Sequence, residues 1–138
     1  MTSWDDVRRI ALALPHTDEE PSKRGQAFWR VKGKSFVWER PLRGTDLEAL
    51  GDAAPAGPIL GARVEHTGAK EALLADDPEV YFTTPHFDGS AIVLVCLERI
   101  GLEDLREVIT EAWLVRAPTP LAEAFIENTL RPPGAQAE

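Results

Sequence analysis

The sequence is poor in sulfur-containing residues, with one cysteine and one methionine among 138 residues. A lone cysteine excludes an internal disulfide, and Cys96 lies in the apolar run 92–97, which predicts a buried, inert thiol. No stretch approaches the roughly 20 apolar residues of a membrane-spanning helix. The N-terminal segment lacks the basic and apolar regions of a secretory signal. We therefore expect a cytoplasmic protein that does not enter a membrane.

Motifs of recognised chemistry are also missing. The chain has no glycine-rich phosphate loop and no Gly-x-Ser-x-Gly turn around a nucleophilic serine. The three histidines, His16, His66 and His86, lie too far apart in the sequence to show the spacing of a zinc or iron site. The sequence thus predicts no catalytic residue, no metal and no cofactor, which favours a protein that is not an enzyme.

Charge is segregated along the chain. The net charge is −8, yet residues 21–43 hold seven cations against a single acid, Glu39. This segment therefore carries +6 and the remainder carries −14. The total argues against non-specific binding to nucleic acid or to an anionic membrane, whereas a local basic patch can still bind an anion. The cations are Lys23, Arg24, Arg30, Lys32, Lys34, Arg40 and Arg43.

Hydrophobic periodicity predicts helices and strands in one α+β domain. Ser3 and Asp6 have nearly the spacing of a helix-capping box, and a helical apolar pattern follows as far as Pro15. Further helices are predicted over 67–75, 102–113 and 119–130, and strands over 27–31, 35–39, 59–66, 80–83 and 91–97.

Two segments are predicted to connect these elements. Residues 16–22 are polar and turn-prone, and residues 41–58 are rich in Pro and Gly around a short helical stretch at 47–50. We expect a single domain over residues 2–130, in which helices at both ends of the chain pack on a mostly antiparallel sheet. Residues 131–138 are expected to form a disordered tail.

Strands 27–31 and 35–39 are predicted to form a hairpin around Lys32-Gly33-Lys34. Strict alternation assigns one face to the core and leaves the other face mixed, with cations near the tip. The predicted core face carries Ala27, Trp29, Val31, Phe36 and Trp38, and the opposite face carries Phe28, Arg30, Lys32, Ser35, Val37 and Glu39.

Several stretches, taken in order, resemble the MmcQ/YjbR family of small bacterial proteins. The resemblance runs from about residue 2 to residue 128 and departs from the family at Ser90-Ala91, where an aromatic residue and a proline are usual. The matching stretches are Trp4-Asp5-Asp6-Val7 with Leu14-Pro15, Phe28-x-x-Val31-x-Gly33-Lys34-x-Phe36, Lys70-Glu71-Ala72-Leu73-Leu74, Phe82-Thr83-Thr84-Pro85-His86-Phe87-Asp88-Gly89, Val93-Leu94-Val95 and Glu111-Ala112-Trp113.

The resemblance implies a compact α+β fold, similar in shape to secretion chaperones and to the frataxin-like CyaY. Members of the family are often labelled DNA-binding by structural analogy, and a fold alone does not decide function.

The basic segment is the first candidate site. A β-hairpin can lie along a DNA backbone, with Lys and Arg meeting phosphates and Phe28 stacking on an unpaired base. The alternatives are that these cations keep the hairpin soluble, pair with acids of the same chain, or bind an acidic protein or an anionic small molecule.

The second candidate is the loop that contains Thr84, Pro85, His86 and Asp88. His86 could act as a base oriented by Asp88, but the sequence identifies no nucleophile or metal for it to serve. The structural interpretation is that Pro85 and Gly89 shape a turn, and it is favoured over catalysis. The predicted function is therefore DNA binding by the basic hairpin region, with a non-catalytic protein- or anion-binding module as the alternative.

Overall fold

The computed structural model describes residues 2–130. These residues form five α-helices and a six-stranded antiparallel sheet with the strand order β1-β2-β3-β4-β6-β5. The strands are β1 (Thr17–Pro21), β2 (Ala27–Val31), β3 (Lys34–Glu39), β4 (Ile59–Arg63), β5 (Tyr81–Phe82) and β6 (Ile92–Cys96). The helices are α1 (Trp4–Leu12), α2 (Gly44–Leu50), α3 (Thr67–Asp76), α4 (Leu102–Arg116) and α5 (Thr119–Leu130), with 3₁₀ turns η1 (Gly51–Ala53) and η2 (Pro85–Phe87).

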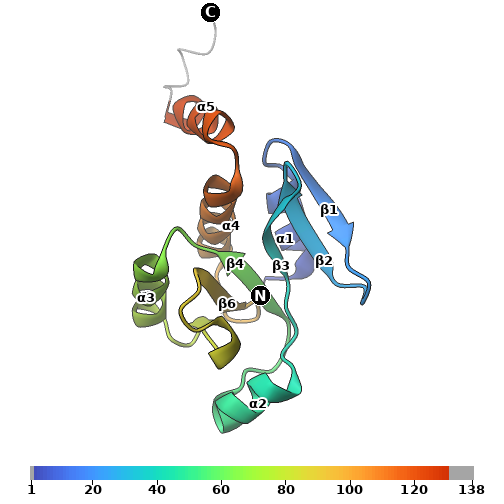
Figure 1. Cartoon of the computed structure of the whole chain (residues 1–138), viewed down its shortest axis with the longest axis vertical. Coiled ribbons are helices and arrows are strands. Elements are labelled where there is room, and N and C mark those ends of the chain that lie inside the picture. The colour runs from blue at the N-terminus through green and yellow to red at the C-terminus, as the bar shows by residue number, and fades with distance from the viewer. Residues whose placement is uncertain (1, 131–138) are drawn as a thin grey trace, which may run out of the picture.

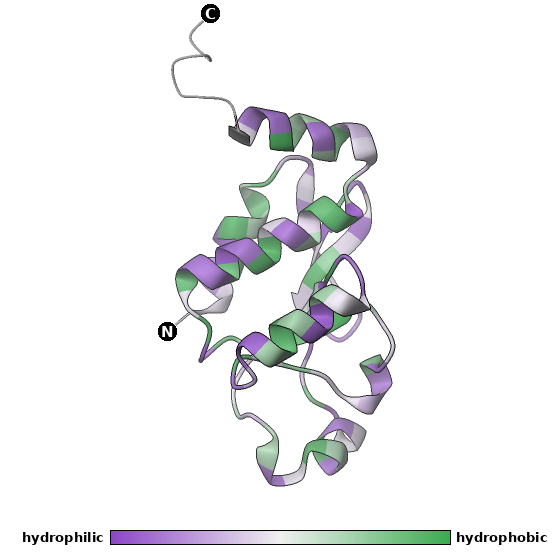
Figure 2. Ribbon diagram, turned by 90° about the vertical axis from the view of Figure 1, so that its left-hand side faces the viewer, coloured by the Kyte–Doolittle hydropathy of each residue, from purple (hydrophilic) through white to green (hydrophobic). Residues whose placement is uncertain are grey.

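The predicted α+β class is confirmed, with helices from both ends of the chain on the sheet. Helices α1 and α4 pack side by side against β2, β3 and β4, behind the strands in Figure 1. Trp29, Leu60 and Trp113 are fully buried between these layers. Green and purple alternate along the helices in Figure 2, as expected for amphipathic helices with one face on a core. The predicted tail, 131–138, lies outside the described residues.

Helices α5 and α2 form the two opposite ends of the molecule. Helix α5 continues from α4 at one end, where Phe125 contacts Trp113 with ring centroids 4.9 Å apart. Helix α2 lies at the opposite end (Figure 1) and packs against η2. The predicted capping box of α1 is present, because the Ser3 N–H donates to the Asp6 carboxylate over 2.9 Å.

The turn predicted over residues 16–22 is wrong, because Thr17–Pro21 form the edge strand β1. Strand β1 has no alternating apolar pattern, and its formation depends on contacts with the neighbouring strand β2. The Arg30 guanidinium on β2 reaches Asp18 and Glu20 on β1, with N–O distances of 3.1 and 3.0 Å. On the other face, Glu19 accepts from the Trp29 indole N–H over 2.9 Å. Strand formation here is therefore a result of cross-strand pairing.

The predicted hairpin faces are wrong beyond Phe36, because a β-bulge interrupts the alternation. Trp29 pairs with Val37 and Arg30 pairs with Ser35, so that Phe36 is an extra residue on β3. Val37 consequently joins Trp29 in the core, and Trp38 lies on the opposite face beside Phe28.

Trp38 lies against a glycine on the neighbouring strand. A Cβ atom at Gly61 would be 2.5 Å from Trp38 Cε2, so the indole needs a residue without a side chain at this position. The same face of the sheet carries a second, smaller apolar cluster made of Ile59, Phe87, Leu94 and Cys96. Cys96 is 3% exposed, which confirms the predicted buried thiol.

Candidate functional site

The seven predicted DNA-binding cations do not form one continuous surface. Lys23 and Arg24 lie in the turn before β2, whereas Lys32 and Lys34 lie after it, at the other end of the strand. The five residues of β2 separate these two groups by roughly 17 Å. Because the hairpin is antiparallel, Arg43 lies beyond the end of β3 that adjoins the first group.

Two of the seven cations are neutralised within the chain. Arg30 is held by Asp18 and Glu20 on β1. Arg40 is 6% exposed, and its guanidinium lies 3.0 Å from the Asp46 carboxylate. Pairing with acids of the same chain was one of the alternatives predicted from the sequence, which did not identify the acids. The other five cations are exposed and form none of the ion pairs found within residues 2–130: Lys23, Arg24, Lys32, Lys34 and Arg43.

The Arg40–Asp46 pair joins the two candidate sites. The Arg40 guanidinium lies over the Phe87 ring, 5.1 Å from its centroid, and so links the end of β3 to η2. Asp46 also accepts from the Arg43 N–H over 2.8 Å. Burial raises the pKa of Asp46, but the Arg43 N–H and the Arg40 charge outweigh it and bring the pKa below its ordinary value. Asp46 is therefore a buried carboxylate whose ion pair with Arg40 holds α2 next to the end of β3.

The loop at residues 84–90 is held by a buried lysine on α3. Lys70 is 5% exposed, and its ammonium group donates to the Phe87 carbonyl over 2.7 Å and to the Ser90 carbonyl over 3.2 Å. Burial lowers the pKa of Lys70, and the charge of Asp88 acts in the opposite direction. Thr84 and Phe87 point inward, whereas the side chains of Pro85, His86 and Asp88 belong to exposed residues.

His86 packs edge-to-face on Phe87, with ring centroids 4.7 Å apart. Within residues 2–130 no hydrogen bond joins His86 to Asp88, and no group of three or more His, Cys, Asp or Glu side chains is placed to hold a metal ion. Among residues 2–130, no helix is long and apolar enough to cross a membrane.

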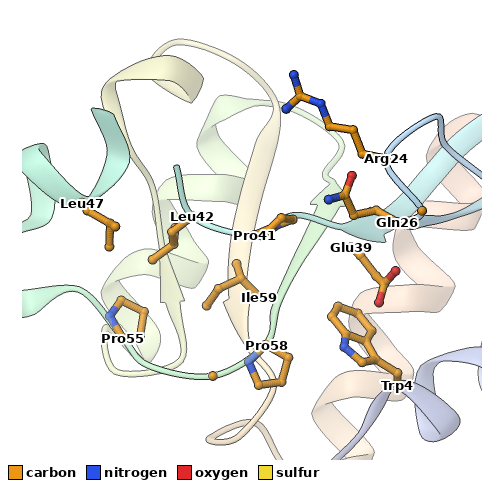
Figure 3. Close-up of a pocket in the computed structure, with 12 residues that line it drawn as sticks. Trp4, Arg24, Gln26, Glu39, Pro41, Leu42, Leu47, Pro55, Pro58 and Ile59 are labelled. Carbon is orange, nitrogen blue, oxygen red and sulfur yellow. The ribbon is translucent and has the colours of Figure 1, made fainter. Parts of the chain in front are cut away.

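A groove of about 530 Å³ opens between the β1–β2 turn and the segment that carries α2 (Figure 3). We call it the Trp4 groove, after one of the residues that line it. One wall is polar and carries Arg24, Gln26 and Glu39. The other wall is apolar and is formed by Pro41, Leu42, Leu47, Pro55, Pro58 and Ile59.

Each wall of the groove is held by a specific contact. Glu39 accepts a hydrogen bond from the Ala27 N–H and ties the end of β3 to the start of β2. Trp4 is fixed by stacking on Trp29, with ring centroids 6.2 Å apart. The Arg40–Asp46 pair positions α2, and Leu47 on this helix is 48% exposed. The groove therefore combines a cation, Arg24, an anion, Glu39, and exposed apolar surface.

Sequence reasoning had found only Arg24 among the residues of the Trp4 groove. Trp4 begins the amphipathic helix α1, and in the structure it is partly buried and lines the groove. The one signal in the sequence was the Pro- and Gly-rich composition of residues 41–58, which is unusual for a simple connection.

Comparison with known proteins assigns the chain to a family. A model of the YjbR family matches residues 12–115. The chain belongs to the YjbR family. The predicted resemblance is thereby confirmed. Two mycobacterial YjbR relatives, the uncharacterised proteins Rv2570 of Mycobacterium tuberculosis and Mb2600 of Mycobacterium bovis, are each 52% identical over 132 residues, which cover 94% of this chain and 99% of the relative.

A solved structure supports the YjbR fold. The crystal structure of the Deinococcus radiodurans protein DR2400, whose family-model domain is DUF419, superposes with a TM-score of 0.63. The superposition covers 83% of this chain and 78% of that chain, at 21% sequence identity. At this level of identity the similarity establishes a shared fold, and the function has to be argued from the site.

Proposed function

We propose that this YjbR domain is a non-catalytic binding module that takes an anionic ligand with an apolar body in the Trp4 groove. The observation that carries the proposal is the placement of Arg24, a cation without an ion-pair partner among residues 2–130, across from the exposed Leu47. The volume of about 530 Å³ lies in the range of small-molecule sites. This ligand chemistry also fits the expected alternatives of an anionic small molecule and an acidic protein segment.

The two walls would divide the recognition between them. Arg24 offers a guanidinium fork that matches a carboxylate or a phosphate. Leu47 and the neighbouring prolines offer apolar surface that is in contact with water, so that covering it is favourable. The indole of Trp4 lines the groove beside Glu39 (Figure 3), where a ring of the ligand can pack on it.

The test is a titration of isotope-labelled protein with a panel of ligands, followed by amide and indole NMR signals. The panel contains aliphatic and aromatic carboxylates, the matching phosphates, and a short peptide with acidic and apolar residues. We expect shifts confined to the Trp4 indole and to residues 24–26 and 41–59. The identity of the strongest binder distinguishes a small molecule from a protein segment.

Two substitutions that each remove one positive charge test whether binding depends on the groove or on net charge. Arg24→Gln removes the groove cation and is expected to weaken binding about tenfold, because a charge-assisted hydrogen bond is removed. Lys34→Gln removes one cation at the far end of β2 and should leave affinity unchanged. Equal losses in the two variants, or shifts spread over the hairpin tip, would show that net charge and not the groove binds the ligand.

DNA binding is the second candidate function, and the free cations at the hairpin tip favour it. Lys32 and Lys34 are exposed and form no ion pair with any other residue of the described range 2–130, and Arg63 ends β4 at the same end of the sheet. Removing a cation that meets a phosphate should reduce the slope of log affinity against log salt by about 0.9 for duplex DNA. We therefore expect the double variant Lys32→Ala/Lys34→Ala to lower the slope by about 2. No binding of duplex or single-stranded DNA at about 50 mM salt, where phosphate contacts are strong, refutes this candidate.

A further inference from the structure

A second groove, unrelated to the Trp4 groove, runs between α3 and α4. It has a volume of about 450 Å³ and an apolar floor made of Val64, Ala69, Ala72 and Leu73. A smaller cavity of about 110 Å³ adjoins it, shares Leu73 with it and reaches Tyr81. The combined space is open to solvent along two helices, which is the shape that receives a third helix.

The rim of this α3–α4 groove carries carboxylates on both sides, and the adjoining cavity is also lined by one cation, Arg63, beside Glu107 and Glu111. Glu65 and Asp76 border it near α3, and Glu111 borders it on α4. None of these carboxylates takes part in an ion pair within residues 2–130. Carboxylates that face each other across a gap repel one another, and a cation placed between them relieves the repulsion.

An unpartnered polar side chain faces the same space. Tyr81 is 5% exposed and lines the smaller cavity, and within residues 2–130 its hydroxyl group forms no hydrogen bond. Burial raises the pKa of Tyr81 to about 12, with further contributions from the charges of Asp104, Asp76, Asp77 and Glu107. The hydroxyl therefore stays neutral and is free to accept a hydrogen bond from an ammonium or guanidinium group.

We propose that the α3–α4 groove is the docking surface for a basic amphipathic helix of a partner protein. The apolar residues of that helix would cover Ala72 and Leu73, while Lys or Arg side chains reach the acidic rim and the Tyr81 hydroxyl. Charge complementarity favours a basic helix, and helices α1 and α5 of a second copy do not supply one. Helix α5 carries no Lys or Arg, and Arg8 and Arg9 on α1 are already paired with acids of their own chain.

The probe is a synthetic amphipathic helix of about 18 residues, with leucines on one face and lysines and arginines beside them. Its binding is followed by fluorescence anisotropy at about 20 mM salt, where charge pairs are weakly screened. A second peptide has the same leucines and glutamates in place of the cations. We expect the basic peptide to bind, the acidic peptide not to bind, and added salt to weaken the complex.

Matched double variants show whether binding depends on carboxylates in the groove or on the net charge of the protein. Asp76→Asn/Glu111→Gln is expected to weaken binding about tenfold. Asp5→Asn/Glu48→Gln removes the same charge at exposed positions outside the groove and should stay within about twofold of the wild type. Tyr81→Phe should lower affinity severalfold without changing the melting temperature, because it removes a hydroxyl that has no partner in the free protein.

Three results would overturn the proposal: equal loss of affinity in the two double variants, binding of the acidic peptide, or no anisotropy change with the basic peptide. Because the Trp4 groove lies elsewhere on the fold, these results are independent of the ligand titrations described above.

Discussion

The buried Arg40–Asp46 pair gives the sharpest test of the structure. The side chains are 8% and 2% exposed, and one oxygen of Asp46 accepts from both the Arg40 guanidinium and the Arg43 N–H. Asp46→Asn keeps the shape and an accepting oxygen but removes the negative charge. Arg40 is then a buried cation without a counter-charge, and such a change costs about 3 kcal/mol or more in the free energy of unfolding.

The measurement is urea unfolding followed by tryptophan fluorescence, with the midpoint and the slope fitted separately. A loss of about 3 kcal/mol corresponds to a fall of roughly 10 °C in the melting temperature of a domain of this size. The matched control is Asp5→Asn, in which the carboxylate is 93% exposed beside Arg8, so that less than about 0.5 kcal/mol is expected.

The dependence on pH provides a second readout of the same pair. The folded-state pKa of Asp46 lies below its ordinary value of 3.8, so its contribution to stability is complete above that pH and is lost as the pH falls through the folded-state value. The difference between the wild type and Asp46→Asn should therefore shrink below about pH 4. A difference that is under about 1 kcal/mol at neutral pH, or that does not change with acid, would refute the assignment of Asp46 as a buried anion.

Three further predictions concern other contacts of the fold. Gly61→Ala should cost about 2 kcal/mol in unfolding experiments, because its Cβ would meet the Trp38 indole, whereas Gly44→Ala, with open space around it, should cost less than about 0.5 kcal/mol. Lys70→Met should lower stability by about 1 kcal/mol, since the Ser90 carbonyl loses its donor, while the Phe87 carbonyl still accepts from the Ser90 N–H and hydroxyl; a loss no larger than that of the Gly44 control would contradict this role of Lys70. Burial raises the pKa of the Cys96 thiol, so a thiol reagent should label it only as fast as the protein unfolds, and rapid labelling of the native protein would contradict its placement.

Much of the fold follows from local patterns in the sequence. The capping box at Ser3 and Asp6, the helical spacing of α4 and the apolar run of β6 each carry their own signal, and each element was predicted. Strand β1 carries no such signal. Its acids are suited to a strand only because Arg30 lies opposite them, and that pairing is a tertiary contact.

The remaining errors have equally specific causes. A single extra residue, Phe36, reverses the faces of Val37 and Trp38, and an alternation rule of period two makes no allowance for a bulge. Arg40 has the composition of a surface cation, and its burial depends on Asp46 returning to it on a short helix six residues later. The Trp4 groove joins α1, the β1–β2 turn and residues 41–59, so no local window of sequence contains it.

The two outer strands of the sheet determine how copies of this protein can meet. Strand β1 is acidic and ends at Pro21, which lacks an N–H to donate to a neighbouring chain. Strand β5, at the other edge, is only two residues long. Neither edge offers a template for a strand from another molecule, so the sheet cannot readily grow into a continuous intermolecular sheet. Two features of composition and length, an acidic strand that ends in proline and a strand of two residues, thus protect the sheet against edge-to-edge aggregation.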